Sequence, residues 1–163
     1  MAIHTVKNTE VEMTQLVMPQ YTNTIGTVFG GQIVSWIDVC AAVSAQRFAR
    51  TPVVTASIDS VNFIEPVKQG QVVILRSQVN AVFKTSIEVG VIVIAENPLT
   101  GERRKACQAY CTFVALDSAG HPVQLPKLVL DAPEEIRRSQ EAHDRRTQRL
   151  SHRTQENSIC LKR

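Results

Sequence analysis

The sequence predicts an α+β protein in which an antiparallel sheet wraps around one long central helix. The run from Gln32 to about Arg50 repeats apolar residues at helical spacing and is apolar at most other positions too, as expected for a helix covered on nearly every side. Most remaining apolar residues fall in short alternating segments joined by short turns, and short turns connect antiparallel neighbours. Because a buried helix and a sheet must cover each other, the sheet should wrap around the helix.

Length and composition narrow the class of protein. The 163 residues suit one domain, and a composition of 44% hydrophobic and 20% charged residues is ordinary for a soluble globular chain and excludes wholesale disorder. The formal net charge of +3 is too small to demand a nucleic-acid partner, and no apolar run is long enough to predict a membrane span. The first residues include acids by position 10 and lack an apolar signal core, which predicts a cytoplasmic protein.

The predicted elements begin with a strand at about 10–18, and the long helix follows a glycine-containing loop. The apolar stripe of that helix consists of Ile33, Trp36, Ile37, Cys40, Ala41, Ser44 and Phe48. After Pro52 the pattern changes to alternating segments rich in β-branched residues. These segments predict strands at 53–63, 71–83, 86–96 and 104–116.

The tail, residues 131–163, holds six acids and eight bases and few apolar residues. A cap at Asp131, a proline in the first turn and two glutamates predict the start of a helix. Its thin apolar stripe predicts a solvated helix that frays after about Arg153; contact with a partner subunit or a polyanion is the alternative. We therefore divide the chain into a domain at 1–125 and a charged helix and tail at 126–163.

Four cysteines, Cys40, Cys107, Cys111 and Cys160, would be reduced thiols in the cytoplasm. None of the four histidines clusters with the pair at 107 and 111, so the sequence predicts no metal site. We expect the first three cysteines to be packed, unreactive thiols.

Asp38 is the one ionisable side chain of the usual acid–base set between Ile33 and Ala45. A carboxylate on an otherwise apolar helix is costly unless it is paired or solvated. Such a group suits a catalytic base or nucleophile. The competing interpretation is a structural aspartate that is bonded to backbone or lies at a subunit seam.

The loop before the helix contains three glycines, Gly26, Gly30 and Gly31. Glycines allow the backbone to approach a ligand closely, and a helix N-terminus offers free N–H groups and a positive dipole end that suit an oxyanion. A plain tight turn would also explain a glycine pair. The loop therefore indicates a ligand site only in combination with Asp38, which lies two turns further along the helix.

Together these residues resemble the signature of hotdog-fold acyl-CoA thioesterases of the bacterial and brain acyl-CoA hydrolase type. The signature is carried by Asn23, Gly26, Phe29, Gly30, Gly31 and Asp38. The later stretches VTASIDSVNFIEPVKQGQVV, FKTS and TGERRKACQAYCTFVALD resemble the same family in order and spacing. The resemblance covers roughly residues 10–125, and no key position is substituted.

The resemblance implies a hotdog fold that hydrolyses acyl-CoA to a free acid and CoA. It implies no cofactor, because CoA belongs to the substrate and product. It also implies a homo-oligomer, a hexamer built as a trimer of dimers, with Asn23 of one chain facing Asp38 of another. Asp38 would act as general base or nucleophile, Asn23 would hold the water or carbonyl, and the N–H of Gly31 or Gln32 would stabilise the oxyanion.

Two groups of residues are candidates for binding the CoA half. The basic cluster Arg103, Arg104 and Lys105 suits its phosphates, although a solvated hairpin end would look the same. By resemblance, Lys84, Thr85 and Ser86 lie near the pantetheine or diphosphate, and Gly30 lies against the substrate.

The sequence leaves open whether the polar residues on the strand at 53–63 have a functional role. Alternation places Thr55, Ser57 and Asp59 on one face, with Asn62 near the strand end. An ordinary polar strand face is the interpretation we favour.

Two other functions compete with thioester hydrolysis. A hotdog hydratase or dehydratase usually pairs a histidine with a carboxylate, and all four histidines lie outside the helix and its loop. An acyl-CoA-binding regulator that contacts nucleic acid would need a recognisable reading element, which one helix of mixed charge does not supply.

Overall fold

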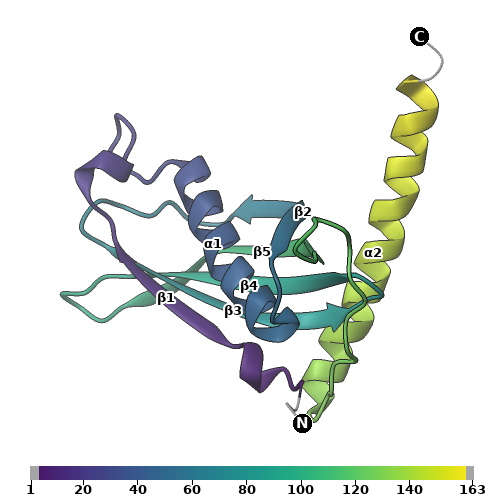
Figure 1. The fold of residues 1–163 in the computed structure, drawn as a ribbon. Coiled ribbons are helices and arrows are strands. Elements are labelled where there is room, and N and C mark those ends of the chain that lie inside the picture. Colours follow the sequence, from purple (N-terminus) through teal and green to yellow (C-terminus); the bar gives the residue numbers. More distant parts are fainter. Residues whose placement is uncertain (1–3, 161–163) are drawn as a thin grey trace.

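The computed structural model describes residues 4–160, with side chains described for residues 4–152 (Figure 1). Its elements are the 3₁₀ turns η1 (Lys7–Thr9) and η2 (Pro19–Tyr21), the helices α1 (Gly30–Ala49) and α2 (Pro133–Cys160), and the strands β1 (Val11–Leu16), β2 (Val53–Phe63), β3 (Val72–Val82), β4 (Ser86–Glu96) and β5 (Arg103–Ala115). One five-stranded antiparallel sheet has the order β1-β3-β4-β5-β2. The prediction of an antiparallel sheet on one long helix is confirmed, and the last four predicted strands match within a residue at each end.

The position of β2 corrects one expectation. Short turns suggested that each strand pairs with the next, but β2 pairs with β5 at the edge of the sheet, while β3 lies between β1 and β4. Residues 64–71 carry the chain across the end of the sheet. There the N–H of Val28 donates to the carbonyl of buried Val67 (2.8 Å), which holds the crossing in place. The outer edge of β2 has no neighbouring strand within the described residues.

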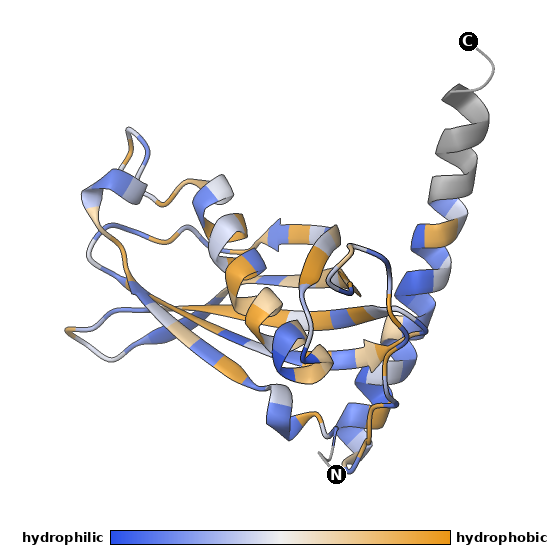
Figure 2. Ribbon diagram, viewed as in Figure 1, coloured by the Kyte–Doolittle hydropathy of each residue, from blue (hydrophilic) through white to orange (hydrophobic). Residues whose placement is uncertain are grey.

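Helix α1 lies along one face of the sheet (Figure 1). Its buried residues are the whole predicted stripe, Ile33, Trp36, Ile37, Cys40, Ala41, Ser44 and Phe48, together with Ala45. Figure 2 shows apolar residues gathered in α1 and in the middle of the strands. One side of the helix is uncovered, because Val39 is 53% and Val43 36% exposed. The expectation of a helix covered on nearly every side is therefore wrong for a single chain.

The start of α1 also differs from expectation. The helix begins at Gly30, so Gly30 and Gly31 are its first residues rather than part of the preceding loop. Phe29 occupies the N-cap position and supplies no side-chain hydrogen bond. The sequence pattern predicted a later start because glycine is a weak helix former and was therefore assigned to the loop.

Helix α2 crosses the face of the sheet opposite α1 and extends beyond it (Figure 1). It is largely hydrophilic (Figure 2), and Ala142 is fully buried. Glu135 accepts hydrogen bonds from the N–H groups of Asp131 (2.7 Å) and Ala132 (3.2 Å), so the cap falls at Ala132 and not at Asp131. The helix also continues to Cys160, past the predicted point of fraying.

No helix in the part of the chain that the structure describes has the length and hydropathy of a membrane span.

Candidate active site

Asp38 lies on the side of α1 that turns away from the core and toward β2, where it is half-buried. One carboxylate oxygen, Oδ1, accepts a hydrogen bond from the hydroxyl of Thr55 (2.8 Å). No hydrogen bond to Oδ2 occurs among the described residues. One oxygen is thus oriented by a neutral donor while the other is available to a water molecule.

A β-bulge decides which residues of β2 accompany Asp38. Thr55 pairs with Phe113 and Ser57 with Thr112, which leaves Ala56 as the extra residue. The bulge therefore turns Thr55 toward α1, whereas Ser57 and the residues after it change faces. Alternation had placed three polar residues on one face, and that expectation is wrong.

Beyond the bulge, Asp59 lies on the α2 side and accepts a hydrogen bond from Arg149 (2.5 Å). Asn62 donates to the carbonyl of Ser60 (3.3 Å). Neither residue contacts Asp38. Thr55 is therefore the polar residue of this strand that belongs to the site, and a hydroxyl on an edge strand was too weak a signal to single it out.

The N-terminus of α1 offers the predicted backbone donors. The N–H of Gln32 donates to the carbonyl of Phe29 (3.0 Å), so it is not free. Gly31 is exposed, and a Cβ added there would meet nothing within 4 Å. At Gly30 a Cβ would lie 3.2 Å from the ring of Phe63. Of the two donors left open by the sequence, Gln32 is already used within the chain, and Gly31 is the exposed one.

Asn23 organises the loop that leads to α1. Its Oδ1 accepts hydrogen bonds from the N–H groups of Ile25 and Thr27 (both 3.1 Å), and its Nδ2 donates to the Thr27 hydroxyl (2.9 Å). An amide nitrogen carries two hydrogens, so one donor remains for another partner. The loop is therefore rigid and presents one N–H of Asn23.

The segment just before Asn23 packs on a side of α1 different from that of Asp38 within one chain. Tyr21, just before the Asn23 loop, packs edge-on against Trp36 with ring centroids 5.2 Å apart. Residues two apart on a helix point in directions about 200° apart, so Asp38 lies on the opposite side from Trp36. Within the described residues no hydrogen bond joins Asn23 to Asp38.

The candidate CoA-binding residues fall into two separate places. Lys84 and Thr85 precede β4 and Ser86 is its first residue, while Arg103 and Arg104 follow the turn after it. An 11-residue strand such as β4 spans about 33 Å, so one phosphate cannot reach both groups within a chain.

The arginines of this cluster already have acidic partners. Arg103 pairs with Glu96, and Arg104 pairs with Glu65 and Glu102. Arg104 lies at the same end of the sheet as the start of α1. It pairs with Glu65, and Glu65 follows closely after Phe63, whose ring lies beside Gly30. The basic cluster therefore has a smaller excess charge than the sequence suggests.

Cys40, Cys107 and Cys111 are buried and unpaired, as expected for packed thiols. Burial raises the pKa of all three thiols, and the nearby carboxylates of Asp38, Asp59 and Glu88 help to raise that of Cys111 to about 12. The described residues contain no group of three or more side chains that could hold a metal ion.

Comparison with known proteins identifies relatives of one kind. The sequence model of the thioesterase superfamily matches residues 25–102. The Bacillus subtilis acyl-CoA thioester hydrolase YkhA is 47% identical over 130 residues, which cover 80% of this chain and 76% of that protein. Mouse acyl-coenzyme A thioesterase 11 is 39% identical over 87% of this chain, and the chain spans 24% of its length.

Solved structures extend the similarity to nearly the whole chain. Acyl-CoA hydrolase from Bacillus cereus superposes with a TM-score of 0.92 at 34% identity and covers 99% of both chains. Acyl-CoA hydrolase from Staphylococcus aureus, solved with butyryl-CoA, CoA and CoA disulfide, gives a TM-score of 0.89 at 30% identity and covers 97% of this chain and 96% of that one. An apo-hexameric acyl-CoA thioesterase gives 0.87 at 38% identity, over 92% and 97% of the two chains.

Structures of the Staphylococcus aureus enzyme have also been solved with alanine in place of one asparagine, one aspartate or one threonine. Along that chain the three positions are separated by 15 and by 17 residues. The same two separations hold for Asn23, Asp38 and Thr55.

Proposed function

The chain belongs to the thioesterase superfamily as a hotdog-fold acyl-CoA thioester hydrolase, and from that premise we propose which of its residues carry out the hydrolysis. Asp38 acts as the general base on water, Thr55 orients its carboxylate, and Gly31 stabilises the oxyanion. Asn23 comes from a second chain. The observation that carries this proposal is the Asp38 carboxylate, which is held at one oxygen by Thr55 and open at the other.

The chemistry of a thioester explains why one carboxylate suffices. Its carbonyl is poorly stabilised by resonance and the thiolate leaves easily, so a water molecule needs only modest activation. Oδ2 of Asp38 takes a proton from that water as it attacks the carbonyl carbon. Direct attack by the same oxygen to give an anhydride is the alternative, and it needs the same free oxygen.

The developing negative charge on the carbonyl oxygen needs a donor. The N–H of Gly31 at the positive end of α1 fits that need, since the residue is exposed and a Cβ added there would meet nothing within 4 Å. The remaining N–H of Asn23 fits the water or the carbonyl. Because the segment just before Asn23 packs on the side of α1 opposite Asp38 in one chain, the two residues act on one substrate where two subunits meet.

The assembly that we propose is a hexamer of paired chains. An exposed side of α1 and the unpaired edge of β2 both lie next to Asp38, so a second subunit there would complete the site. A hexameric acyl-CoA thioesterase with 38% identity supports this assembly. Related rat and mouse enzymes carry the description cytosolic, which supports a cytoplasmic location here.

CoA binding involves both candidate groups, contributed by different subunits. Arg103 and Arg104 carry the phosphate-binding charge, with the carboxylates beside them exchanging partners when CoA binds. Lys84, Thr85 and Ser86 contact the pantetheine or diphosphate from the other end of the sheet. The Staphylococcus aureus enzyme solved with CoA supports a CoA site on this fold.

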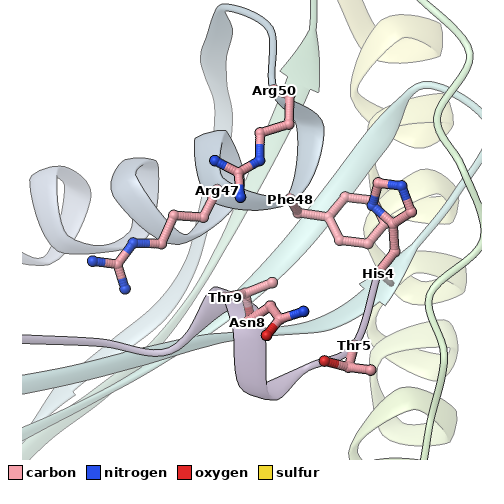
Figure 3. Close-up of a pocket in the computed structure, with 7 residues that line it drawn as sticks. All are labelled: His4, Thr5, Asn8, Thr9, Arg47, Phe48 and Arg50. Atoms are coloured by element: carbon pink, nitrogen blue, oxygen red, sulfur yellow. The ribbon is translucent and has the colours of Figure 1, made fainter. Parts of the chain in front are cut away.

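Neither rival function finds support at the site. No hydrogen bond or ion pair joins any of the four histidines to Asp38 within the described residues. His4 packs at a tilt against Phe48 (Figure 3), His143 packs edge-on against Phe83, His121 approaches Asp117, and His152 is exposed on α2. A hydratase would lack its usual histidine. A regulator that only binds acyl-CoA would have no need for an oriented carboxylate beside free backbone donors.

Release of free thiol from acyl-CoA tests the proposal. Asp38→Asn removes the base while it keeps the shape of the side chain and the hydrogen bond from Thr55. We expect its kcat to fall at least about 1,000-fold, in line with loss of a general base. Asp144→Asn, an exposed carboxylate on α2, serves as the matched control and should keep the full rate. A folded Asp38→Asn protein with an unchanged rate would exclude Asp38 as the base.

A further inference from the structure

Two arginines of α2 reach the outer face of the sheet one helical turn apart. Arg145 binds the fully buried carboxylate of Glu88 on β4 through Nη2 (2.7 Å) and Nε (3.2 Å). Its guanidinium also lies 3.6 Å from the ring centre of Tyr110 on β5. A charge-assisted pair with a buried carboxylate fixes the position and register of α2 on the sheet.

The second arginine, Arg149, contacts β2. Its Nη1 donates to Oδ2 of Asp59 (2.5 Å), while Oδ1 of Asp59 accepts a hydrogen bond from the hydroxyl of Ser57 (2.6 Å). The side chains of Arg149 and Asp59 are 21% and 20% exposed, so this pair is screened less than a surface ion pair.

The Arg149 contact lies between two irregularities of an edge strand. The first is the bulge at Ala56, and the second falls between Asp59 and Asn62, where Ser60 has a φ of 41°. A bulge removes ladder hydrogen bonds, and the outer edge of β2 has no neighbour within the described residues. The conformation of this segment therefore depends on contacts made by its side chains.

Those contacts come from opposite faces of β2. On one face Thr55 binds Asp38 (2.8 Å), and on the other Asp59 binds Arg149 (2.5 Å). The bulge lies between the two anchors. A change at Arg149 thus reaches the Asp38 carboxylate through Asp59, the bulge and Thr55, a short path with a defined hydrogen bond at each end.

We propose that Arg149 is a positioning residue for thioester hydrolysis, which holds the bulge of β2 so that Thr55 orients Asp38. This inference rests on the proposed role of Asp38. Arg149 itself lies on the other face of the sheet and does not contact the substrate. The charged helix α2 is thereby part of what sets the catalytic geometry.

The first test separates kcat from KM. Arg149→Met keeps the length of the side chain and removes its charge, and Asp59→Asn removes the partner charge. We expect each to lower kcat about tenfold, as a small displacement of a catalytic group does, with KM changed less than about twofold. The double variant should be no slower than either single one, and Arg149→Lys should restore at least about half of the rate.

Arg146→Met is the matched control, because Arg146 lies on the same helix and stacks on Phe83, 4.6 Å away, rather than on β2. Its kcat should equal that of the unmodified protein. Thermal unfolding of every variant identifies those that are folded. If Arg149→Met does not fold, Asp59→Asn provides the loss in its place, and Arg149→Lys remains the variant that should keep the rate.

The second test is a double-mutant cycle with Thr55→Val. If Arg149 acts through Thr55, the combined loss of kcat will be smaller than the product of the single losses. Multiplicative losses, or an unchanged kcat in folded Arg149→Met, would overturn the inference while a dead Asp38→Asn still upheld the proposed function. An active Asp38→Asn would instead overturn the proposed function itself.

Discussion

Three carboxylates help to raise the pKa of Cys111, and one of them differs from the other two in its partner. Glu88 binds Arg145 and Asp59 binds Arg149, whereas Asp38 binds the neutral hydroxyl of Thr55. An arginine partner stabilises the ionised form of a carboxylate and occupies its oxygens. It therefore disfavours transfer of a proton to that carboxylate. A threonine orients the group without that opposition. The neutral partner is what sets the proposed catalytic carboxylate apart from the other two.

Thr55 should matter to the rate far more than to stability. Thr55→Val removes the hydrogen bond to Asp38 and keeps the shape, so we expect kcat to fall about 10- to 100-fold. Because Thr55 is exposed in the single chain, the free energy of unfolding should change by less than about 0.5 kcal/mol. Steady-state kinetics and urea unfolding measure the two effects. Thr55→Ser keeps the hydroxyl, and a loss as large as that of valine would argue against the hydrogen bond.

The buried thiols predict a pH effect of defined sign. Because the pKa of Cys111 is raised from 9.0 to about 12, the folded protein keeps this thiol protonated where the unfolded chain would ionise it. This group therefore stabilises the fold fully below pH 9 and loses that contribution as pH rises toward 12. At pH 8, iodoacetamide should leave Cys111 unmodified in the native protein and alkylate it in urea, as mass spectrometry can show. Rapid alkylation of the native thiol would contradict its burial.

At the scale of elements, Gly31 in the first turn of α1 affects both the stability of the helix and the proposed access of the substrate to a backbone N–H. Gly31 is a poor helix former, yet a Cβ there would meet nothing within 4 Å. Packing within the chain therefore does not require a glycine at this position. If the backbone N–H of this residue stabilises the oxyanion, a glycine is required instead because it gives the substrate carbonyl access to that N–H.

Gly31→Ala should separate stability from activity. We expect the free energy of unfolding to stay the same or rise by up to about 1 kcal/mol, because alanine favours the helix. We expect kcat to fall at least tenfold, roughly the effect of impairing one oxyanion donor. Urea unfolding and thiol release measure these quantities. At Gly30 the added Cβ would meet the Phe63 ring at 3.2 Å, so Gly30→Ala should gain less stability than Gly31→Ala. Full activity in Gly31→Ala would assign the oxyanion to another donor.

The elements also show how far sequence reasoning reaches. Periodicity located the strands at 53–63 and 86–96 with the bounds that the structure has, because alternation records which side faces the core. It did not reveal the bulge at Ala56, since an extra residue changes the face of everything that follows without altering composition. Thr55 was therefore grouped with the wrong neighbours.

The residues of the candidate site were predictable to the same extent as the strands. The contrast between one charge and an apolar helix singled out Asp38 but left a structural aspartate open, and its catalytic role was predicted from the family resemblance. Partners such as Thr55 for Asp38, or Glu65 for Arg104, depend on which strands become neighbours, and β2 lies beside β5 rather than β3. Contacts between distant segments were thus beyond what spacing could predict.

At the scale of the whole molecule, the single chain leaves two features without a partner. β2 is an 11-residue edge strand, and the side of α1 beside it exposes Val39 and Val43. An exposed edge next to an apolar surface favours association with a second copy. Asp38 lies beside both features, so the surface that would join two chains and the proposed site coincide.

If the site is shared between chains, two inactive variants should complement each other. Subunits with Asn23→Ala and with Asp38→Asn, co-expressed with different tags and purified as mixed oligomers, form pairs in which one site carries both changes and the other carries none. Each mixed pair should then show about half of the normal rate, although either variant alone is nearly inactive. Thiol release from the doubly tagged oligomer measures the recovery. A mixed oligomer no more active than its parents would place Asn23 and Asp38 at separate sites, and the proposed division of roles between subunits would have to be abandoned.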